Sequence, residues 1–523
     1  MTGSAPPHET CTVFNELSGL DDAAIHRFVV GEDRTPRVLA GEEAAAQLGD
    51  PFATLLLLKG VFPDTAGEVL AALDEATESE NPLRKNRFFL LGEGSQIPHT
   101  PQTAGLQRNL RFLAARGDGP DGPDILLSAF HPDESDVEVM AWDRARGGFN
   151  FYRTVSDTRA WVFAGNSAHA LTPPSERKGP FESHLSGAFL MKELRSPWIS
   201  WDSPAARIQP SVFAQDDPLR QHPWFAERDG NGAITCEEAV ARPSMRRWAR
   251  VRMGAVKEAG TVQRPARILR QVLETPTVNL ISSHVESAIA DTVDVIEVPQ
   301  TFFVDSEALV ELEDLGLPAP PPFDVPPEIY HQSLERFGFR MSDGNGFERP
   351  GDTHFAFLVP ERAFEDIVVE AEAIRIGMLT PKLAATLLMV DFPNPVFSSR
   401  RAALMRHVPG PGPVENLSER MSDAILAAAQ GAPAGSPEDE FAALWSAGEG
   451  WQERYAVLLQ DYYAKVTQRL STQEGFDAYV RLAESRRERV RAMPITESRL
   501  LFAETDIPKA QRSMRADGAV EEA

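Results

Sequence analysis

The chain has 523 residues, of which 42% are hydrophobic and 25% are charged, and its formal net charge is −25. This length and composition are those of a globular protein with two or three domains. The negative charge argues against nucleic acid as a partner, because phosphate binding needs a cationic surface.

The two cysteines, Cys11 and Cys236, exclude a disulfide scaffold, a four-cysteine iron–sulfur cluster and a cysteine-rich zinc module. The first residues are polar and lack the cationic start and apolar core of a signal peptide. The longest apolar run, residues 53–58, is too short to span a bilayer. We therefore expect a cytoplasmic protein without a membrane partner.

The chain up to residue 165 predicts a helix followed by a sheet. Residues 63–76 have the pattern of an amphipathic helix. Residues 137–143 alternate apolar and polar side chains, and the aromatic-rich residues 148–155 return after a tight loop, which predicts a β-hairpin. Further strands are predicted at residues 86–94, 125–130 and 161–165.

A helix is predicted from Pro180 to the residue before Pro197, because proline is favoured in a first helical turn and ends a helix later on. Its apolar residues recur at helical spacing. One face of this helix would carry His184, Ala188, Met191 and Arg195, and the small alanine would let a flat partner approach closely.

Residues 227–238 resemble the calcium loop of an EF-hand. Asp229, Asn231 and Glu238 match the third, fifth and twelfth positions of that loop. The first position holds Glu227 where the pattern has aspartate, and no second loop of this kind occurs. The segment therefore predicts either a structural calcium site or a helix-capping turn.

The segment 242–270 is strongly basic and includes Arg246 and Arg250, four residues apart on a predicted helix. In so acidic a protein, these arginines either pair with internal carboxylates or receive an anionic ligand.

The second half of the chain predicts a few strands and then helices. The Pro-rich residues 317–327 predict a linker or an extended loop, and residues 408–413 predict a domain boundary. Strands are predicted at residues 277–281, 295–304 and 354–359, and helices at 361–377, 381–391, 398–407, 417–430, 438–447, 451–470 and 475–493.

Ser167 follows the predicted strand 161–165, which is where a hydrolase of the nucleophile-elbow type carries its serine. That turn needs a small residue two positions after the serine, and the chain has His169 there. The chain also lacks the alternating strands and helices of a hydrolase sheet. A serine hydrolase is therefore only the third alternative for function.

Residues 180–184, Pro-Phe-Glu-Ser-His, occupy the frame of a covalent haem-attachment site, with Pro180 and Ser183 at the two cysteine positions. Together with the predicted hairpin, the run Met-Lys-Glu-Leu at 191–194 and residues 391–397, this frame resembles a group of uncharacterised bacterial cytochrome-like proteins. The resemblance extends over residues 85–410.

This resemblance implies a haem, held non-covalently because both cysteines are absent. It makes His184 an axial ligand and His169 a second one. Arg195, Arg246 and Arg250 would then pair with the haem propionates. The alternative is that His184 is a histidine hydrogen-bonded locally at the start of a helix.

The sequence thus predicts an α+β protein with a mixed, largely antiparallel sheet, flanking helices and a helical C-terminal region. The regions expected are a mixed N-terminal region (1–84), a central α+β domain (85–410), a helical region (414–510) and a disordered tail (511–523).

The first functional hypothesis is a cytoplasmic oxidoreductase with haem or another transition-metal centre, acting on a small-molecule substrate. The competing hypothesis is a non-catalytic binding or scaffold protein, with calcium in the loop 227–238. The substrate, the reaction and the oligomeric state are left open.

Overall fold

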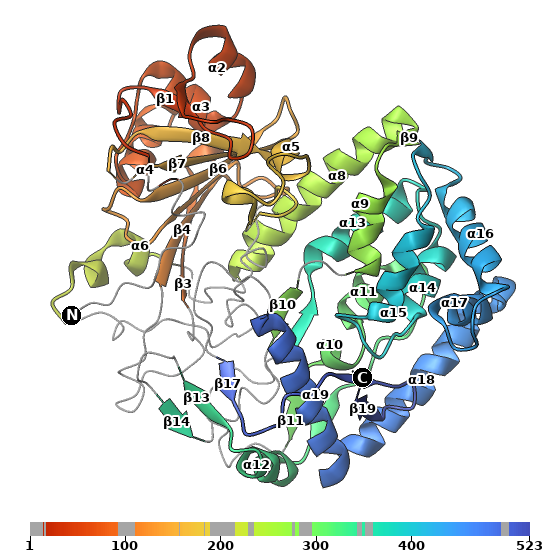
Figure 1. The fold of residues 1–523 in the computed structure, drawn as a ribbon. Coiled ribbons are helices and arrows are strands. Elements are labelled where there is room, and N and C mark those ends of the chain that lie inside the picture. The colour runs from red at the N-terminus through yellow and green to blue at the C-terminus, as the bar shows by residue number, and fades with distance from the viewer. Residues whose placement is uncertain are drawn as a thin grey trace. The chain divides into compact units, whose positions relative to one another are not determined.

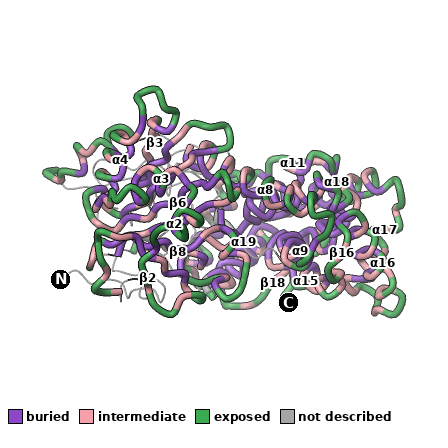
Figure 2. Tube along the Cα trace, turned by 90° about the horizontal axis from the view of Figure 1, so that it is seen from above, coloured by how far each residue is buried: buried purple, intermediate pink, exposed green. Residues whose placement is uncertain are grey.

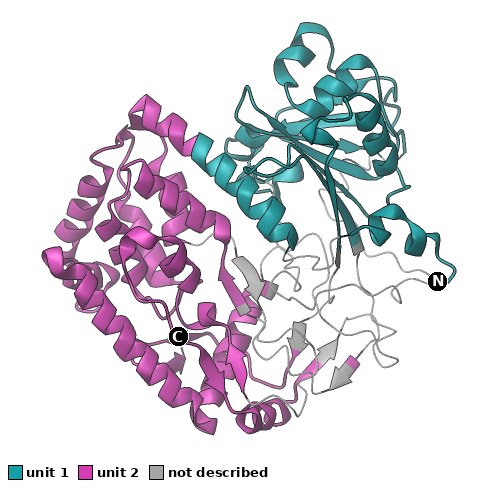
Figure 3. Ribbon diagram, turned by 180° about the vertical axis from the view of Figure 1, so that it is seen from behind, with its two compact units in different colours: residues 1–251, 495–500 teal, residues 252–494, 501–523 magenta. Residues whose placement is uncertain are grey.

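The chain divides into two compact units (Figure 3). The computed structural model describes residues 14, 17–92, 110–155, 157–182, 184–188, 215–228, 235–274, 278–281, 295–342, 348–350, 359–492 and 502–522. Unit 1 comprises Met1–Val251 with Ile495–Leu500, and unit 2 comprises Arg252–Pro494 with Leu501–Ala523. The boundaries expected near residues 84 and 410 fall inside unit 1 and unit 2, respectively.

Unit 1 is built on an eight-stranded sheet in the order β2-β1-β8-β7-β6-β5-β4-β3 (Figure 1). Strands β1 and β8 pair in parallel, and the other neighbours pair antiparallel. The predicted α+β class with a mixed, largely antiparallel sheet is therefore confirmed. The strands are β1 (Ile25–Arg27), β2 (Arg37–Val38), β3 (Asn86–Gly92), β4 (Leu110–Arg116), β5 (Ile125–Ala129), β6 (Val137–Asp143), β7 (Gly148–Thr154) and β8 (Trp161–Asn166).

Both faces of the central strands are covered, because β6 and β8 are buried at nearly every position (Figure 2). On one face, Trp161 packs against Phe52 of helix α3 (Pro51–Leu55), with 5.0 Å between ring centroids. The Trp161 indole N–H donates to the Pro63 carbonyl at 2.8 Å. The next residue, Val162, is buried in the apolar cluster of Phe14 on the opposite face.

The helix expected at residues 63–76 is confirmed as α4 (Ala66–Glu75), and Thr65 and Glu68 form the capping box at its start. The helix expected after Pro180 is wrong over the described residues. The chain forms only one 3-10 turn, η3 (Gly179–Glu182), and Gly187 then has a φ of +78°, which helices do not contain. The other helices of unit 1 are α2 (Gly41–Gln47), α5 (Ser167–Ala170), α6 (Pro223–Ala226) and the π-helical turn η6 (Glu237–Ala241).

Unit 2 packs helices around small sheets of two and three strands (Figure 1). The seven helices predicted after residue 360 are confirmed, with ends shifted by a few residues. None of the described helices combines the length and the apolar composition needed to cross a membrane. The helices are α9 (Pro265–Leu273), α10 (Gln300–Phe303), α11 (Ser306–Glu311), α12 (Pro327–Arg336), α13 (Phe364–Arg375), α14 (Pro381–Met389), α15 (Ser399–Ala403) with η9 (Leu404–His407), α16 (Leu417–Ala429), α17 (Pro437–Trp445), α18 (Trp451–Leu470) and α19 (Gln473–Arg491).

Helix α8 (Arg242–Ala259) runs from unit 1 into unit 2, because the division at Val251 falls inside it. The strands of unit 2 pair as β9 with β16, β10 with β15, β11 with β12, β13 with both β14 and β17, and β18 with β19. Their bounds are β9 (Thr261–Val262), β10 (Val278–Ile281), β11 (Ile296–Val298), β12 (Phe323–Val325), β13 (Arg340–Ser342), β14 (Glu348–Pro350), β15 (Val359–Arg362), β16 (Gly412–Pro413), β17 (Phe502–Glu504), β18 (Arg512–Met514) and β19 (Val520–Glu522).

Three expectations for unit 2 differ from the structure. The strand expected at residues 295–304 ends at Val298, and α10 follows it. Residues 408–413 do not separate compact units, because β16 pairs with β9. The tail expected to be disordered forms the hairpin of β18 and β19. Asn394 fixes this hairpin by accepting the Met514 N–H at 2.9 Å and donating to the Met514 carbonyl at 2.8 Å.

Candidate functional site

His184 follows η3 and lies against β7 in unit 1. Its Nδ1 is 3.0 Å from the carbonyl oxygen of Ala188. Its ring centroid is 5.1 Å from that of Phe151, which also contacts the Phe181 ring at 5.3 Å. A neutral imidazole that donates from Nδ1 carries its lone pair on Nε2. Metal-binding histidines are usually held in this way, with the other ring nitrogen donating to a carbonyl or a carboxylate.

His169 lies in α5 with the opposite arrangement of its ring nitrogens. Its Nδ1 accepts the N–H of Asn166 at 3.0 Å, so the proton of the neutral ring is on Nε2, which lies 3.5 Å from Glu32 Oε2. Burial lowers the pKa of His169, although the Glu32 carboxylate acts in the other direction. Because its lone pair already accepts a backbone N–H, His169 is not suited to ligate a metal, and we do not include it in the proposed site.

We expect acidification to destabilise unit 1 through His169. Its pKa is lower in the folded than in the unfolded chain, so its contribution is complete above the unfolded pKa of about 6.5 and is lost as the pH falls through the folded pKa. Hydrogen exchange of β8 amides from neutral pH to about pH 5 measures the free energy of local opening. This free energy should fall more steeply in the wild-type protein than in His169→Gln, which keeps the capping box of α5. Equal slopes would contradict the assignment.

Charged side chains from β4, β6 and β7 gather near His184. The Glu138 carboxylate lies 3.7 Å from an Arg153 nitrogen and 3.9 Å from an Arg111 nitrogen. Arg153 also lies 3.8 Å from Asp136. Burial raises the pKa of Glu138, but the positive charges of Arg153 and Arg111 act in the other direction, and the pKa is lowered. This group holds a carboxylate that lies close enough to the imidazole to interact with it, and two cations that lie beside the carboxylate.

Arg153 is the cation of this group with the most unused hydrogen-bonding capacity. Its side chain is only 12% exposed, and its guanidinium carbon lies 4.7 Å from the centre of the Phe14 ring. Its two ion pairs are longer than hydrogen bonds, and its buried Nε has no partner among the described residues. Such a guanidinium is suited to bind a carboxylate or phosphate through two parallel hydrogen bonds.

Glu138 and Arg153 belong to no known sequence motif, and the sequence analysis did not identify them. The predicted hairpin nevertheless indicates that they pair. Asp143 and Gly148 flank its loop and pair with each other, and the same register pairs Glu138 with Arg153. Opposite charges at directly paired positions are a reason to examine a hairpin for a site. Arg111 had no comparable signal, because β4 was not predicted.

The arginines predicted on α8 lie elsewhere in unit 1. Arg246 and Arg250 are exposed, and Arg250 pairs with Asp121 at 3.3 Å. Their neighbour Arg247 donates to the Gly122 carbonyl at 3.1 Å and lies 4.8 Å from the Trp142 ring. These contacts favour the interpretation that the basic segment pairs with carboxylates and carbonyls of the protein. Arg195 lies outside the described residues.

The calcium loop is described only in part. Asp229 and Asn231 lie outside the described residues, and Glu238 lies in η6, which continues directly into α8. Within the described part of the chain, no three side chains of His, Cys, Asp or Glu are grouped to hold a metal ion. Calcium binding at this loop therefore stays a prediction.

Ser167 is a structural residue in the described fold. It is 1% exposed, its hydroxyl donates to the Gly187 carbonyl at 2.6 Å, and it accepts the Phe149 N–H at 2.8 Å. A hydroxyl held in this way does not serve as a nucleophile, and we do not propose a hydrolase.

The described residues that come together with the chemistry of a site in unit 1 are thus His184, Glu138, Arg111 and Arg153. Comparison of the chain with models of protein families, with curated proteins and with solved structures found no match.

Proposed function

We propose that the protein is a cytoplasmic oxidoreductase that acts on a small molecule with the help of a non-covalently bound haem. The observation that carries this proposal is the contact of His184 Nδ1 with the Ala188 carbonyl at 3.0 Å, because it directs the lone pair to Nε2. His184, which the sequence predicts as a ligand, would hold the haem iron, and His169 would not.

The surrounding residues fit the same ligand. Arg153 and Arg111 supply positive charge for two propionates, and they replace the arginines of α8 in that role. The buried ring of Phe151 packs against both the imidazole and the buried ring of Phe181, so the ligand side chain is supported by apolar groups. When bound, a haem supplies electron-transfer and oxygen chemistry that amino-acid side chains lack.

The chain's own residues would have separate tasks. The Ala188 carbonyl fixes the orientation and the tautomer of His184. Arg153 and Arg111 hold Glu138 in its ionised form, because they lower its pKa. An ionised carboxylate near the imidazole can take up a proton from a substrate.

Titration of the purified full-length protein with haemin tests this proposal. We expect saturation at one equivalent with a shifted Soret band, and at least about tenfold weaker binding in His184→Ala, since even the loss of outer partners of a metal ligand has that effect. In His184→Gly, added imidazole should restore the spectrum. This rescue distinguishes a lost ligand from a lost fold.

His169→Gln is the matched control, because it replaces the other histidine of the region and keeps its capping role. It should bind haemin like the wild-type protein. Arg153→Met should weaken binding about tenfold through the loss of one charge-assisted contact. An unshifted haemin spectrum, or equal binding by His184→Ala, would overturn the proposal and leave the scaffold hypothesis as the better one.

A further inference from the structure

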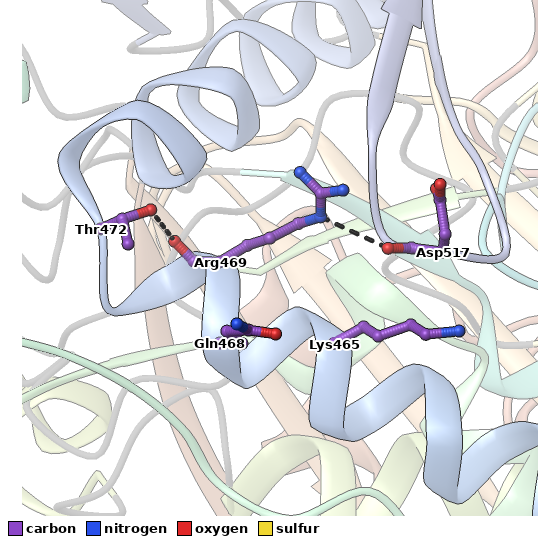
Figure 4. Close-up of a pocket in the computed structure, with 5 residues that line it drawn as sticks. All are labelled: Lys465, Gln468, Arg469, Thr472 and Asp517. Carbon is purple, nitrogen blue, oxygen red and sulfur yellow. Dashed lines mark hydrogen bonds between the residues drawn. The ribbon is translucent and has the colours of Figure 1, made fainter.

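Unit 2 has a hollow between α18 and the turn that joins β18 to β19 (Figure 4). One part, of about 370 Å³, is lined by Lys465, Gln468, Arg469, Thr472 and Asp517. A second part, of about 400 Å³, shares Lys465 and Asp517 with the first, so the two parts adjoin. The second part is also lined by Phe392, Leu458, Asp461, Arg515 and Ala516.

The turn that forms one wall of this hollow is held firmly. The Asp517 carboxylate accepts the Ala519 N–H at 3.0 Å, and the Asp517 carbonyl accepts Arg469 Nε at 3.3 Å. The Tyr479 hydroxyl donates to the Gly518 carbonyl at 3.0 Å. Gly518 has a φ of +72°, and a side chain there would meet the Tyr479 hydroxyl at 3.2 Å. The position of this wall is therefore fixed by the fold.

The cations of the hollow differ in how far they are neutralised. Lys465 pairs with Asp461 at 2.5 Å, and Arg515 pairs with Asp517 at 3.3 Å. Arg469 uses only Nε, and its two terminal nitrogens make no hydrogen bond to any described residue. Figure 4 shows the Lys465 and Arg469 side chains extending side by side toward the turn of Asp517. They form a cationic pair one helical turn apart.

The adjoining part of the hollow is apolar on one side. Phe392 and Leu458 line it, and Leu458 is 38% exposed although it is a large apolar residue. A hollow that combines an apolar wall with a few directed polar groups is typical of a site for a small organic ligand.

We propose that this hollow binds a small organic anion. Its carboxylate or phosphate group lies between Lys465 and Arg469, where the terminal guanidinium nitrogens donate to it. Its apolar part lies along Phe392 and Leu458. The net charge of −25 repels anions from the protein as a whole. Binding of an anion therefore depends on the local contacts in the hollow.

Calorimetric titration of the full-length protein with octyl phosphate, octanoate and inorganic phosphate tests this site. We expect the two amphiphilic anions to bind at least about tenfold more tightly than inorganic phosphate, because only they reach the apolar wall. If octyl phosphate binds more tightly than octanoate, the site prefers a phosphate group, and the reverse order shows a preference for a carboxylate. Binding of inorganic phosphate alone, or no binding of any probe, would overturn the proposal.

Variants locate the site. Arg469→Ala should weaken octyl phosphate binding at least about tenfold, and Leu458→Ser should weaken it while leaving inorganic phosphate unaffected. Arg454→Ala is the matched control, since Arg454 is an exposed cation of the same helix and does not line the hollow. Unchanged binding in Arg469→Ala, or an equal loss in Arg454→Ala, would place the anion elsewhere.

Discussion

Replacing Arg362 by methionine is expected to lower the free energy of unfolding of unit 2 by about 3–5 kcal/mol, the effect of removing one partner from a buried ion pair. The Arg362 side chain is 1% exposed and lies 3.0 Å from Asp305 and 2.7 Å from Glu370. It also donates to the Gln271 carbonyl at 3.2 Å. Methionine fills a similar volume but leaves two carboxylates in the interior without their cation.

The pH dependence of this loss is a further test. Burial raises the pKa of Glu370 even though Arg362 opposes the shift, so removal of Arg362 raises that pKa further. A carboxyl group whose pKa is raised on folding favours the folded state at low pH, and this advantage is lost as the pH rises through the folded pKa. The deficit of Arg362→Met should therefore be smaller at pH 5 than at pH 8. It can be measured by hydrogen exchange of α13 amides in both proteins.

Arg401→Met is the matched control for Arg362→Met, because Arg401 is also 1% exposed. Its Nη2 donates to the Asn394 carbonyl at 2.8 Å, and its Nε and Nη1 have no partner among the described residues. No described carboxylate forms an ion pair with Arg401. Its removal therefore leaves no carboxylate without a direct partner. Its loss should be less than half that of Arg362→Met. Arg401 also interacts electrostatically with Asp305 and Glu370 without contacting them. Equal losses in the two variants would therefore show that direct ion pairing adds nothing to this longer-range effect.

The second large effect is expected at Asp50 in unit 1, where alanine should lower the free energy of unfolding by about 3 kcal/mol. Asp50 is fully buried and caps α3 by accepting the Ala53 N–H at 3.0 Å. Its other oxygen accepts Asn150 Nδ2 at 2.7 Å and the Tyr152 hydroxyl at 2.5 Å. Alanine therefore removes a helix cap, leaves the Tyr152 hydroxyl without its acceptor, and leaves Asn150 Nδ2 with only a long contact of 3.5 Å to the Gln47 carbonyl.

Two milder variants separate these contributions. Burial raises the pKa of Asp50, so its charge itself is a destabilising element. Asp50→Asn removes the charge and keeps an acceptor for the cap, so it should lose about half as much as Asp50→Ala. Tyr152→Phe should lose about 1 kcal/mol, the typical worth of one hydrogen bond. Hydrogen exchange of β7 amides reports all three, and an Asn variant as unstable as the Ala variant would contradict the role given to the charge.

The regular elements were predictable where a single periodicity dominates. The alternating residues 137–143 became β6, and the apolar spacing of residues 451–470 became α18 with the same bounds. The helix expected after Pro180 fails for a reason that local spacing does not contain. Gly187 is held at a positive φ against the backbone of Ser167, 20 residues earlier, where a Cβ would come within 2.6 Å of the Ser167 Cα.

The sequence predicted only one residue of the candidate site. His184 was identified from the sequence, but the carbonyl that orients it and the arginines beside it depend on the packing of η3 against β7. Arg362 and Arg401 could not be assigned to the core of unit 2, because periodicity places charged residues at the surface. Burial of such residues depends on partners distant in sequence, such as Asp305 for Arg362.

The pairing of Asn394 with Met514, together with that of β13 with β17, bears on synthesis at the ribosome. The strands of the unit 1 sheet are all translated by Asn166, whereas unit 2 cannot close before Met514 has emerged. At about 5–20 residues per second, the interval is on the order of 20–70 s. Helix α19 packs against β18 and β19, so it lacks these partners until the last residues have emerged. We infer that unit 2 is the part of the nascent chain that needs chaperones most.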